Sequence, residues 1–199
     1  MNLHQGIAAL GLSLPAGAEE ALAAYLRLLL KWNRIYNLTA IRDESEMVTH
    51  HLLDSLAVLP HLGDVGSLAD VGSGAGLPAI PLAIARPELR VTSIESNDKK
   101  ATFQQQARIE LALGNLQVRR SRAEEVEGGF DAAISRAFAE LAEFVRIAGA
   151  LAPRLYAMKG VYPEEEIARL PAGWRVIDAK KLTVPRLAAA RHLIVIGRN

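Results

Sequence analysis

Cysteine is absent from the 199 residues of the chain. Its absence excludes disulfide bonds, thiolate metal sites and cysteine nucleophiles, whatever the fold. The adjacent pair His50 and His51 has no third ligand at a suitable spacing, so we expect no metal site. Any catalysis has to depend on other side chains or on a bound organic cofactor.

Long apolar runs are also missing. The segment Ala21–Leu30 is interrupted by Tyr25 and Arg27, and it falls short of the ~20 apolar residues that a membrane-spanning helix requires. Residues 1–14 lack the basic and continuously apolar segments of a signal peptide. We therefore expect a cytoplasmic protein with no membrane partner.

Charge of one sign is not in excess either. Lys and Arg together number 23, Asp and Glu 22, and the net charge of +1 is weak for a domain that holds nucleic acid by charge alone. Basic residues do cluster at 119–122 and in the tail from Lys180 to Arg198. Solvated turns explain these clusters as well as an RNA-binding surface does.

What the sequence does contain is the composition of one globular unit, with 50% hydrophobic residues. Apolar residues at helical spacing predict a helix over residues 16–32. A second helix is predicted to begin at Asp43, where Glu46 follows three residues later as in a helix N-terminal cap. We expect residues 1–62 to form an all-helical appendage.

From residue 63 short apolar runs alternate with helical stretches, a pattern typical of a parallel sheet covered by helices. The predicted strands are 67–71, 90–95, 117–119, 130–135, 154–159, 175–184 and 192–197, and the predicted helices are 78–86, 98–113, 139–151 and a short one after Pro163. The last two strands have no helix between them, which predicts an antiparallel hairpin at one edge. Residues 63–199 are thus expected to form a doubly wound α/β domain that shares one core with the appendage.

A glycine-rich segment, Asp70-Val71-Gly72-Ser73-Gly74-Ala75-Gly76-Leu77-Pro78, lies between the first predicted strand and its helix. Glycines there permit a tight turn and a close approach of the backbone to a ligand, and the helix start offers unpaired N–H groups. Glu95, at the end of the second strand, stands where such folds place a carboxylate that accepts ribose hydroxyls. The sequence therefore predicts a ligand that contains a ribose.

Several cofactors use this arrangement. A P-loop is excluded, because no Lys-Ser or Lys-Thr follows the last glycine. A dinucleotide stays open, because residues 74–79 match the looser G-x-G-x-x-A fingerprint. Asp70 argues against a dinucleotide, because a carboxylate at this position attracts the cationic amino-acid end of S-adenosylmethionine and repels a pyrophosphate. We favour S-adenosylmethionine, with NAD(P) as the alternative.

With these residues in view, nearly the whole chain resembles the bacterial ribosomal RNA small subunit guanine-N7 methyltransferases, also called glucose-inhibited division protein B. Besides the glycine segment, the resemblance is carried by Trp32-Asn33-Arg34-Ile35-Tyr36-Asn37-Leu38-Thr39, His51-Leu52-Leu53-Asp54-Ser55, Ile134-Ser135-Arg136-Ala137-Phe138 and Met158-Lys159-Gly160. Ala79 departs from the family pattern, which has glycine there, and this bears on local packing. The resemblance implies a Rossmann-like class I S-adenosylmethionine-dependent methyltransferase fold with a mostly parallel, seven-stranded sheet.

The resemblance also implies which residues bind the cofactor: Gly72, Leu77, Ala123, Glu124 and Arg136. On the physical grounds above we add Asp70, Gly74 and Glu95. The implied substrate is a guanine of 16S rRNA, nucleotide 527 in the usual rRNA numbering, methylated on N7. We expect a monomer that acts on 16S rRNA within the 30S subunit. Arg136, Lys159 and Asn37 are candidate RNA contacts, with ordinary surface roles as the alternative.

Guanine N7 carries a free lone pair, so its methylation needs no general base, and we name no catalytic residue. Holding donor and acceptor in line would supply most of the rate. The missing cysteine and the missing Pro-Pro-Tyr motif fit this chemistry, because pyrimidine C5 methylation commonly uses a cysteine and amino-group methylation commonly uses that motif. Two other readings stay open: a small NAD(P)-dependent oxidoreductase and a non-catalytic ribosome-associated binding protein.

Overall fold

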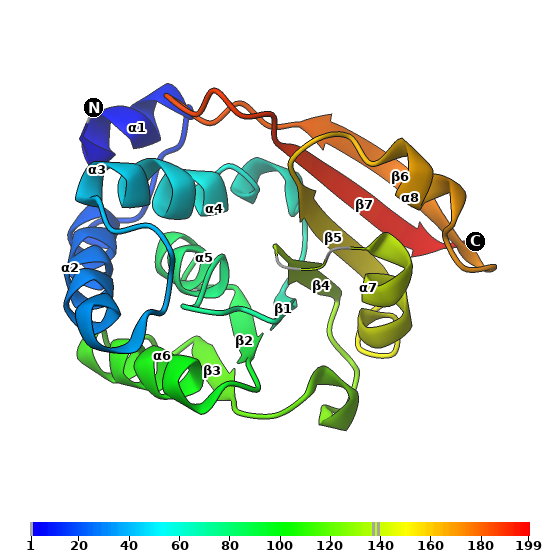
Figure 1. The fold of residues 1–199 in the computed structure, drawn as a ribbon, viewed down its shortest axis with the longest axis horizontal. Helices are drawn as coiled ribbons and strands as arrows, with labels where there is room; N and C mark the ends of the chain where they lie inside the picture. Colours follow the sequence, from blue (N-terminus) through cyan, green and yellow to red (C-terminus); the bar gives the residue numbers. More distant parts are fainter. Residues whose placement is uncertain (1, 137, 139) are drawn as a thin grey trace.

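The computed structural model describes every residue except Met1, Ala137 and Ala139, so the predicted helix start at Ala139 lies outside the described residues. One sheet of seven strands runs in the order β3-β2-β1-β4-β5-β7-β6 (Figure 1). The strands are β1 (Ser67–Val71), β2 (Arg90–Ile94), β3 (Leu116–Arg119), β4 (Ala132–Ser135), β5 (Arg154–Lys159), β6 (Trp174–Lys181) and β7 (His192–Arg198). Strands β1 to β5 are parallel, and β7 is antiparallel to both β5 and β6. This confirms the predicted sheet and its antiparallel edge hairpin.

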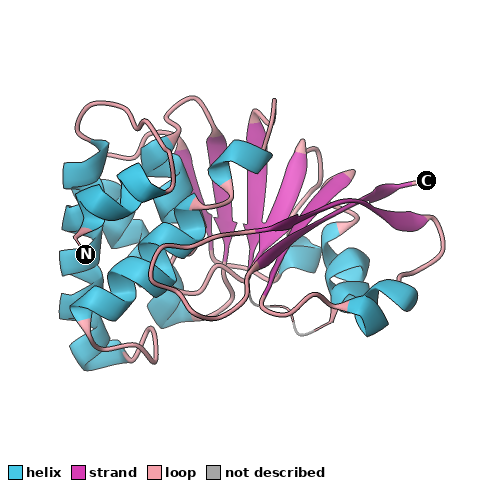
Figure 2. Cartoon of the chain, turned by 90° about the horizontal axis from the view of Figure 1, so that it is seen from above, coloured by secondary structure: helices cyan, strands magenta, loops and turns pink. Residues whose placement is uncertain are grey.

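Helices cover both faces of the sheet (Figure 2). One face carries α1 (Leu3–Ala9), α2 (Ala18–Tyr36), α5 (Ala79–Ala85), α6 (Asp98–Glu110) and a continuous stretch made of α3 (Glu44–Met47), the π-helix η1 (Val48–Leu53) and α4 (Asp54–Leu56). The other face carries α7 (Leu141–Ala148) and α8 (Glu164–Ala168), while η2 (Leu59–His61) and η3 (Ala123–Glu125) are 3-10 turns. No helix in the described part of the chain has the length and apolarity of a membrane span.

Side chains along the strands alternate between two apolar cores, because successive residues of a strand point to opposite faces. In β1, Leu68 belongs to the core beside the appendage and Ala69 to the core beside α7, and Leu193 and Ile194 of β7 divide in the same way. The first core also contains fully buried appendage residues such as Leu29. Residues on both sides of residue 62, the predicted boundary, thus pack in one apolar core. The division of the chain into an appendage and an α/β domain stays a prediction.

Most predicted boundaries hold to within a few residues, and β1 and β5 match their predicted bounds. Helix α2 runs four residues past the predicted end at Trp32 and stops at Asn37, whose left-handed backbone (φ 49°) ends it. Strand β4 begins at Ala132, two residues later than predicted. The strand begins later because the carboxylate of Asp131, and not the backbone, accepts hydrogen bonds from the N–H groups of Gly66 and Ser67.

Strand β6, the outermost strand beside β7, is irregular. Its pairing with β7 shifts register between Val176 and Asp178, and most of its side chains are exposed. It also ends at Lys181, three residues before the predicted end.

A buried tyrosine of the appendage holds the glycine segment in place. Tyr25 of α2 is fully buried, and its hydroxyl donates a 2.7 Å hydrogen bond to the carbonyl of Ala75. Burial raises the pKa of Tyr25 far above its ordinary range, so the hydroxyl keeps the proton that it donates. The ring also packs 6.1 Å from that of Phe103 in α6. Helix α2 is therefore fixed to the loop that follows β1.

Tyr25→Phe keeps the ring but deprives the buried Ala75 carbonyl of its partner. We expect the free energy of unfolding to fall by about 1–3 kcal/mol, as measured by urea denaturation. Tyr36→Phe is the matched control, because Tyr36 is 41% exposed and its hydroxyl makes no hydrogen bond to the described residues. Equal losses in the two variants would contradict the anchoring role of Tyr25.

Candidate active site

The glycine segment forms a turn that leaves room for a ligand. Gly72 and Gly74 have φ values of 70° and 59°, a left-handed conformation that strains residues with a side chain. A Cβ atom on Gly74 would meet nothing within 4 Å, so the loop has open space beside it. The turn lies at the carboxyl end of β1, the edge where open α/β sheets bind ligands.

Glu95 lies against this loop, just after β2. One carboxylate oxygen accepts the N–H of Gly74 at 2.7 Å, and the other accepts the N–H of Asn97 at 2.8 Å. A carboxylate has about four acceptor positions, so two remain for the hydroxyls of a ribose. The structure thus brings together the two features from which the sequence predicts a ribose ligand.

A buried polar network of Ser73, Ser93 and Gln104 supports the glycine turn, and the sequence did not predict it. Gln104 of α6 donates to the carbonyl of Gly74 at 2.7 Å and to the hydroxyl of Ser73 at 2.8 Å. Ser93 of β2 bonds to both Ser73 and Gln104, and all three side chains are buried. The only signal in the sequence is a glutamine that falls among the buried positions of a predicted helix.

Asp70 is fully buried at the end of β1. One of its oxygens accepts the first N–H of α5, from Ala79, at 3.0 Å, and the other has no hydrogen-bond partner among the described residues. Burial raises the pKa of Asp70 to about 7, although the Ala79 hydrogen bond and the charge of Arg136 act in the opposite direction. The predicted contact between Asp70 and the amino end of the cofactor stays a prediction.

Two cavities open at the carboxyl edge of the sheet. The first, of about 260 Å³, lies between the ends of β1 and β2, the chain after β3, and α7. It is lined by Val71, Gly72, Ile94, Ser96, Ser121, Arg122, Ala123, Glu124, Phe138 and Ile147. Three residues predicted to bind the cofactor, Gly72, Ala123 and Glu124, are among them, whereas Leu77 is buried in the first core. Apolar walls with a polar rim suit the adenosyl part of a cofactor.

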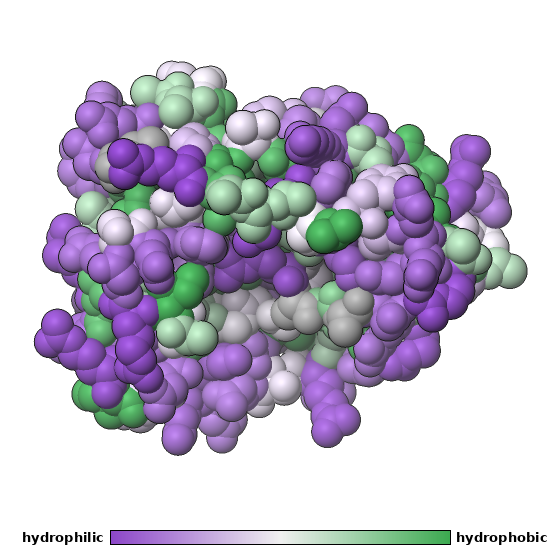
Figure 3. Space-filling model, turned by 45° about the horizontal axis from the view of Figure 1, so that its top comes forward, coloured by the Kyte–Doolittle hydropathy of each residue, from purple (hydrophilic) through white to green (hydrophobic). Residues whose placement is uncertain are grey.

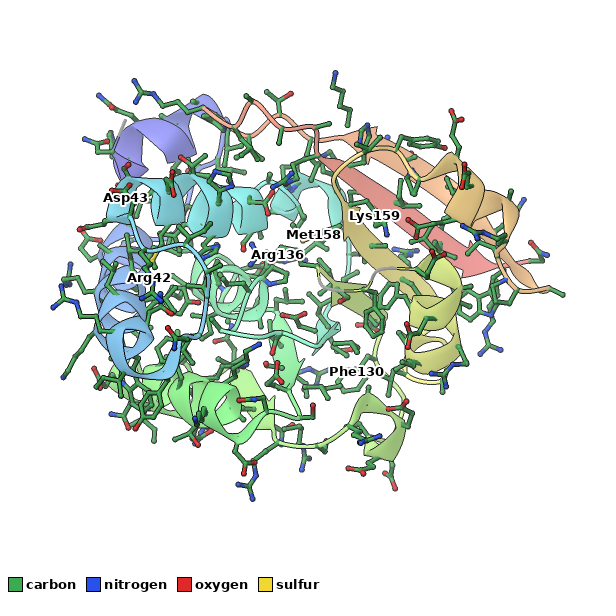
Figure 4. All side chains as sticks on the ribbon, viewed as in Figure 1. Arg42, Asp43, Phe130, Arg136, Met158 and Lys159 are labelled. Carbon is green, nitrogen blue, oxygen red and sulfur yellow. The ribbon has the colours of Figure 1, made fainter. Side chains whose placement is uncertain are left out.

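The second cavity, of about 340 Å³, is formed by parts of the chain that are far apart in sequence (Figure 4). It is lined by Ile41, His50, His51, Asp54, Arg136, Met158, Lys159, Gly160 and Arg191. Arg136 and Lys159 were predicted for the site, whereas Asn37 lies outside both cavities and accepts a hydrogen bond from Arg42 at 2.8 Å. Within the described residues, no three histidine or acidic side chains are grouped as metal ligands.

A buried carboxylate organises the second cavity. Asp54, only 2% exposed, accepts from Nε of Arg191 at 3.0 Å and from Nη1 of Arg136 at 3.4 Å. Arg136 also donates to the carbonyl of His50 at 3.0 Å. Two guanidinium groups share one carboxylate, so this cluster has a net positive charge.

Lys159 and His51 each have a partner as well, although Nδ1 of His51 has none among the described residues. Lys159 lies 2.8 Å from the carboxylate of Glu166 in α8, so its charge is balanced within the protein. Burial, reinforced by Arg136, lowers the pKa of His51 to about 4, and its Nε2 lies 2.9 Å from the hydroxyl of Thr39. His51 is therefore neutral at neutral pH.

The sheet order, the glycine turn after β1 and the acidic residue after β2 define a class I S-adenosylmethionine-dependent methyltransferase. Solved structures share the fold: a SAM dependent methyltransferase from Aquifex aeolicus matches with a TM-score of 0.60 and 19% identity, over 77% of this chain and 93% of that one. M. jannaschii TYW2 in complex with AdoMet matches with a TM-score of 0.56 and 17% identity, over 74% of each chain.

The family model described as rRNA small subunit methyltransferase G (GidB) matches residues 18–194. Ribosomal RNA small subunit methyltransferase G of Aromatoleum aromaticum is 60% identical over 100% of this chain and 98% of its own length. The protein of that name from Neisseria meningitidis is 49% identical over the same shares. The chain belongs to the rRNA small subunit methyltransferase G family, and its cofactor is S-adenosylmethionine. This sets aside the dinucleotide alternative.

Gly74→Asp should abolish S-adenosylmethionine binding in calorimetry, because the new side chain occupies the open space of the turn and its charge lies beside Glu95. Gly11→Asp is the matched control, since Gly11 also has a left-handed backbone (φ 68°) with nothing within 4 Å of a Cβ atom. Both variants should lose about 1–2 kcal/mol of stability from backbone strain. Undiminished cofactor binding by Gly74→Asp would remove the turn from the site.

Asp70→Asn tests the raised pKa of the buried carboxyl. Because the pKa of Asp70 is about 7 when folded and 3.8 in a model peptide, the native state binds the extra proton between these values and loses stability as pH rises through them. The free energy of unfolding, measured by urea denaturation, should therefore fall in the wild type relative to the variant by about 2–4 kcal/mol between pH 4 and pH 8. The lowered pKa of His51 changes stability with pH in the opposite direction, but it does so equally in both proteins and cancels when they are compared. Parallel pH profiles would contradict the burial effect.

Proposed function

We propose that the protein methylates N7 of a guanine in 16S rRNA, nucleotide 527 in the usual numbering, within the 30S subunit and as a monomer. The family description and the names of its relatives support rRNA of the small subunit as the substrate class. In this proposal the first cavity takes the adenosyl part of the cofactor and the second takes the guanine. The observation that carries the proposal is the second cavity, which offers donors and in which the lining carboxylate, Asp54, is held by two arginines.

The carboxylates around the second cavity are already engaged. Asp54 is held by two arginines, and Glu166 accepts from Lys159 and from the N–H of Leu141 at 2.8 Å. With a pKa of about 4, His51 is a weak base at neutral pH. Methylation of an amino group requires the loss of a proton, whereas N7 attacks with a free lone pair. A cavity whose carboxylate is held by two arginines therefore suits N7 better than an amino group.

The donors of the cavity also favour guanine over adenine. Guanine presents the acceptors O6 and N7 on one edge, whereas adenine replaces O6 with an amino donor. Arg136 and Arg191 have N–H groups beyond those that Asp54 accepts, and these groups can donate to O6 while the lone pair of N7 stays free to attack the methyl group. Two cations beside O6 would repel the amino group of adenine.

The residues around the glycine turn fit S-adenosylmethionine, because Gly74 leaves open space and Glu95 keeps two acceptor positions for ribose hydroxyls. When bound, S-adenosylmethionine supplies an electrophilic methyl group on its sulfonium. The glycine turn, Glu95 and the arginines of the second cavity hold the reactants in fixed positions, which supplies most of the rate. No residue has to remove a proton from N7.

The test is transfer of labelled methyl from S-adenosylmethionine to 30S subunits that lack N7-methylguanine, with the product mapped by chain cleavage. We expect one labelled guanine, at nucleotide 527. Subunits reconstituted with 7-deazaguanine there, in which carbon replaces N7, should take up no label. Label on another nucleotide would overturn the proposed target, and labelling of the deaza subunits would overturn N7 as the acceptor atom.

A further inference from the structure

Two exposed apolar residues come next in the chain after residues that line the second cavity, and this adjacency places them beside its rim. Val161 is 79% exposed and Tyr162 is 40% exposed, and both directly follow Lys159 and Gly160, which line the cavity. Isolated apolar residues are common on protein surfaces. This pair differs because it follows two residues that line a cavity with positive charge. Figure 3 shows that one face of the molecule is mostly hydrophilic, with small hydrophobic patches scattered over it.

The segment is held in a defined position. Nδ1 of His192 lies 2.7 Å from the carbonyl of Gly160, and the rings of His192 and Tyr162 meet edge to face with centroids 5.7 Å apart. The carbonyl of Tyr162 accepts the N–H of Glu164 at 3.2 Å, where α8 begins. A surface that is ordered before binding loses little entropy when a partner arrives.

The chemistry of the rim fits an unpaired nucleotide. RNA-binding proteins read single-stranded segments by stacking bases on aromatic rings, next to cations that attract the backbone. Arg191, which lines the cavity, precedes His192 in the chain and supplies such a cation. A guanine that enters the second cavity remains covalently joined to its neighbours, so one flanking nucleotide has to cross the rim.

We propose that Tyr162, supported by Val161, is a stacking platform for an unpaired nucleotide next to the target guanine. The inference rests on the proposed function, because it requires the guanine to occupy the second cavity. Tyr162 touches no reacting atom in this arrangement and is a positioning residue. It strengthens the binding of RNA and leaves the methyl-transfer step unchanged.

The experiment measures steady-state methyl transfer to unmethylated 30S subunits at saturating S-adenosylmethionine. Tyr162→Ala should raise KM for the subunit about tenfold and leave kcat within about twofold. Tyr162→Phe keeps the ring and should behave like the wild type. Ile109→Ala is the matched control, because Ile109 is 62% exposed on α6 and lines neither cavity. Tyr162→Leu, which keeps apolar bulk without a ring, should also raise KM and serves if the alanine variant fails to fold.

An unchanged KM in the Ala and Leu variants would overturn the platform, and so would an equal rise in Tyr162→Phe. Replacing Tyr162 by a photoreactive benzoylphenylalanine identifies the partner: a crosslink to a nucleotide beside the target guanine supports the proposal. Crosslinks only to ribosomal protein or to distant rRNA, or none, would overturn it. Failure of the proposed function is seen separately, because the wild-type protein would then place its label somewhere other than N7 of guanine 527, or place none.

Discussion

The arrangement of the second cavity depends on one buried carboxylate. Asp54 lies in the appendage, whereas its two partners, Arg136 and Arg191, follow β4 and precede β7. Without Asp54 the two guanidinium groups would repel each other inside a partly buried site. Without the arginines the carboxylate would be buried with no counterion, which is strongly unfavourable. The interaction therefore joins the helical appendage to the carboxyl edge of the sheet at the point where the proposed substrate binds.

The appendage reaches the cofactor side as well, through the hydrogen bond from Tyr25 to the loop after β1. Methyltransferases with different substrates share this α/β fold, so the fold alone does not select a substrate. In this chain the residues that distinguish the site come largely from the helices in front of the sheet and from the hairpin at its edge. The appendage and the residue before β7, Arg191, meet at the same end of the sheet, where they help to line the second cavity.

The sequence predicted those features that depend on residues close together in the chain. The apolar runs located β1 and β5, and the glycine segment with Glu95 indicated the cofactor site, because these signals lie in neighbouring residues or at the ends of adjacent strands. Arg191 could not be predicted in this way, since its partner Asp54 is 137 residues away. Tyr25 and Gln104 have the appearance of ordinary helix residues, and only the packing of α2 and α6 reveals that they support the loop. Lys159 stays a candidate RNA contact, and no sequence pattern indicated that Glu166 would balance its charge.

The irregular outer strand β6 has a consequence for association between chains. A long, flat edge strand offers unpaired N–H and C=O groups to which a strand of another molecule can bind, and bulges and lysines are the common protections against this. Strand β6 has a register shift beside Asp178 and ends in Lys180 and Lys181, while the opposite edge, β3, is only four residues long and ends in Arg119. Both edges therefore disfavour extension of the sheet by a second copy, so crowded molecules of this protein are protected against edge-to-edge aggregation.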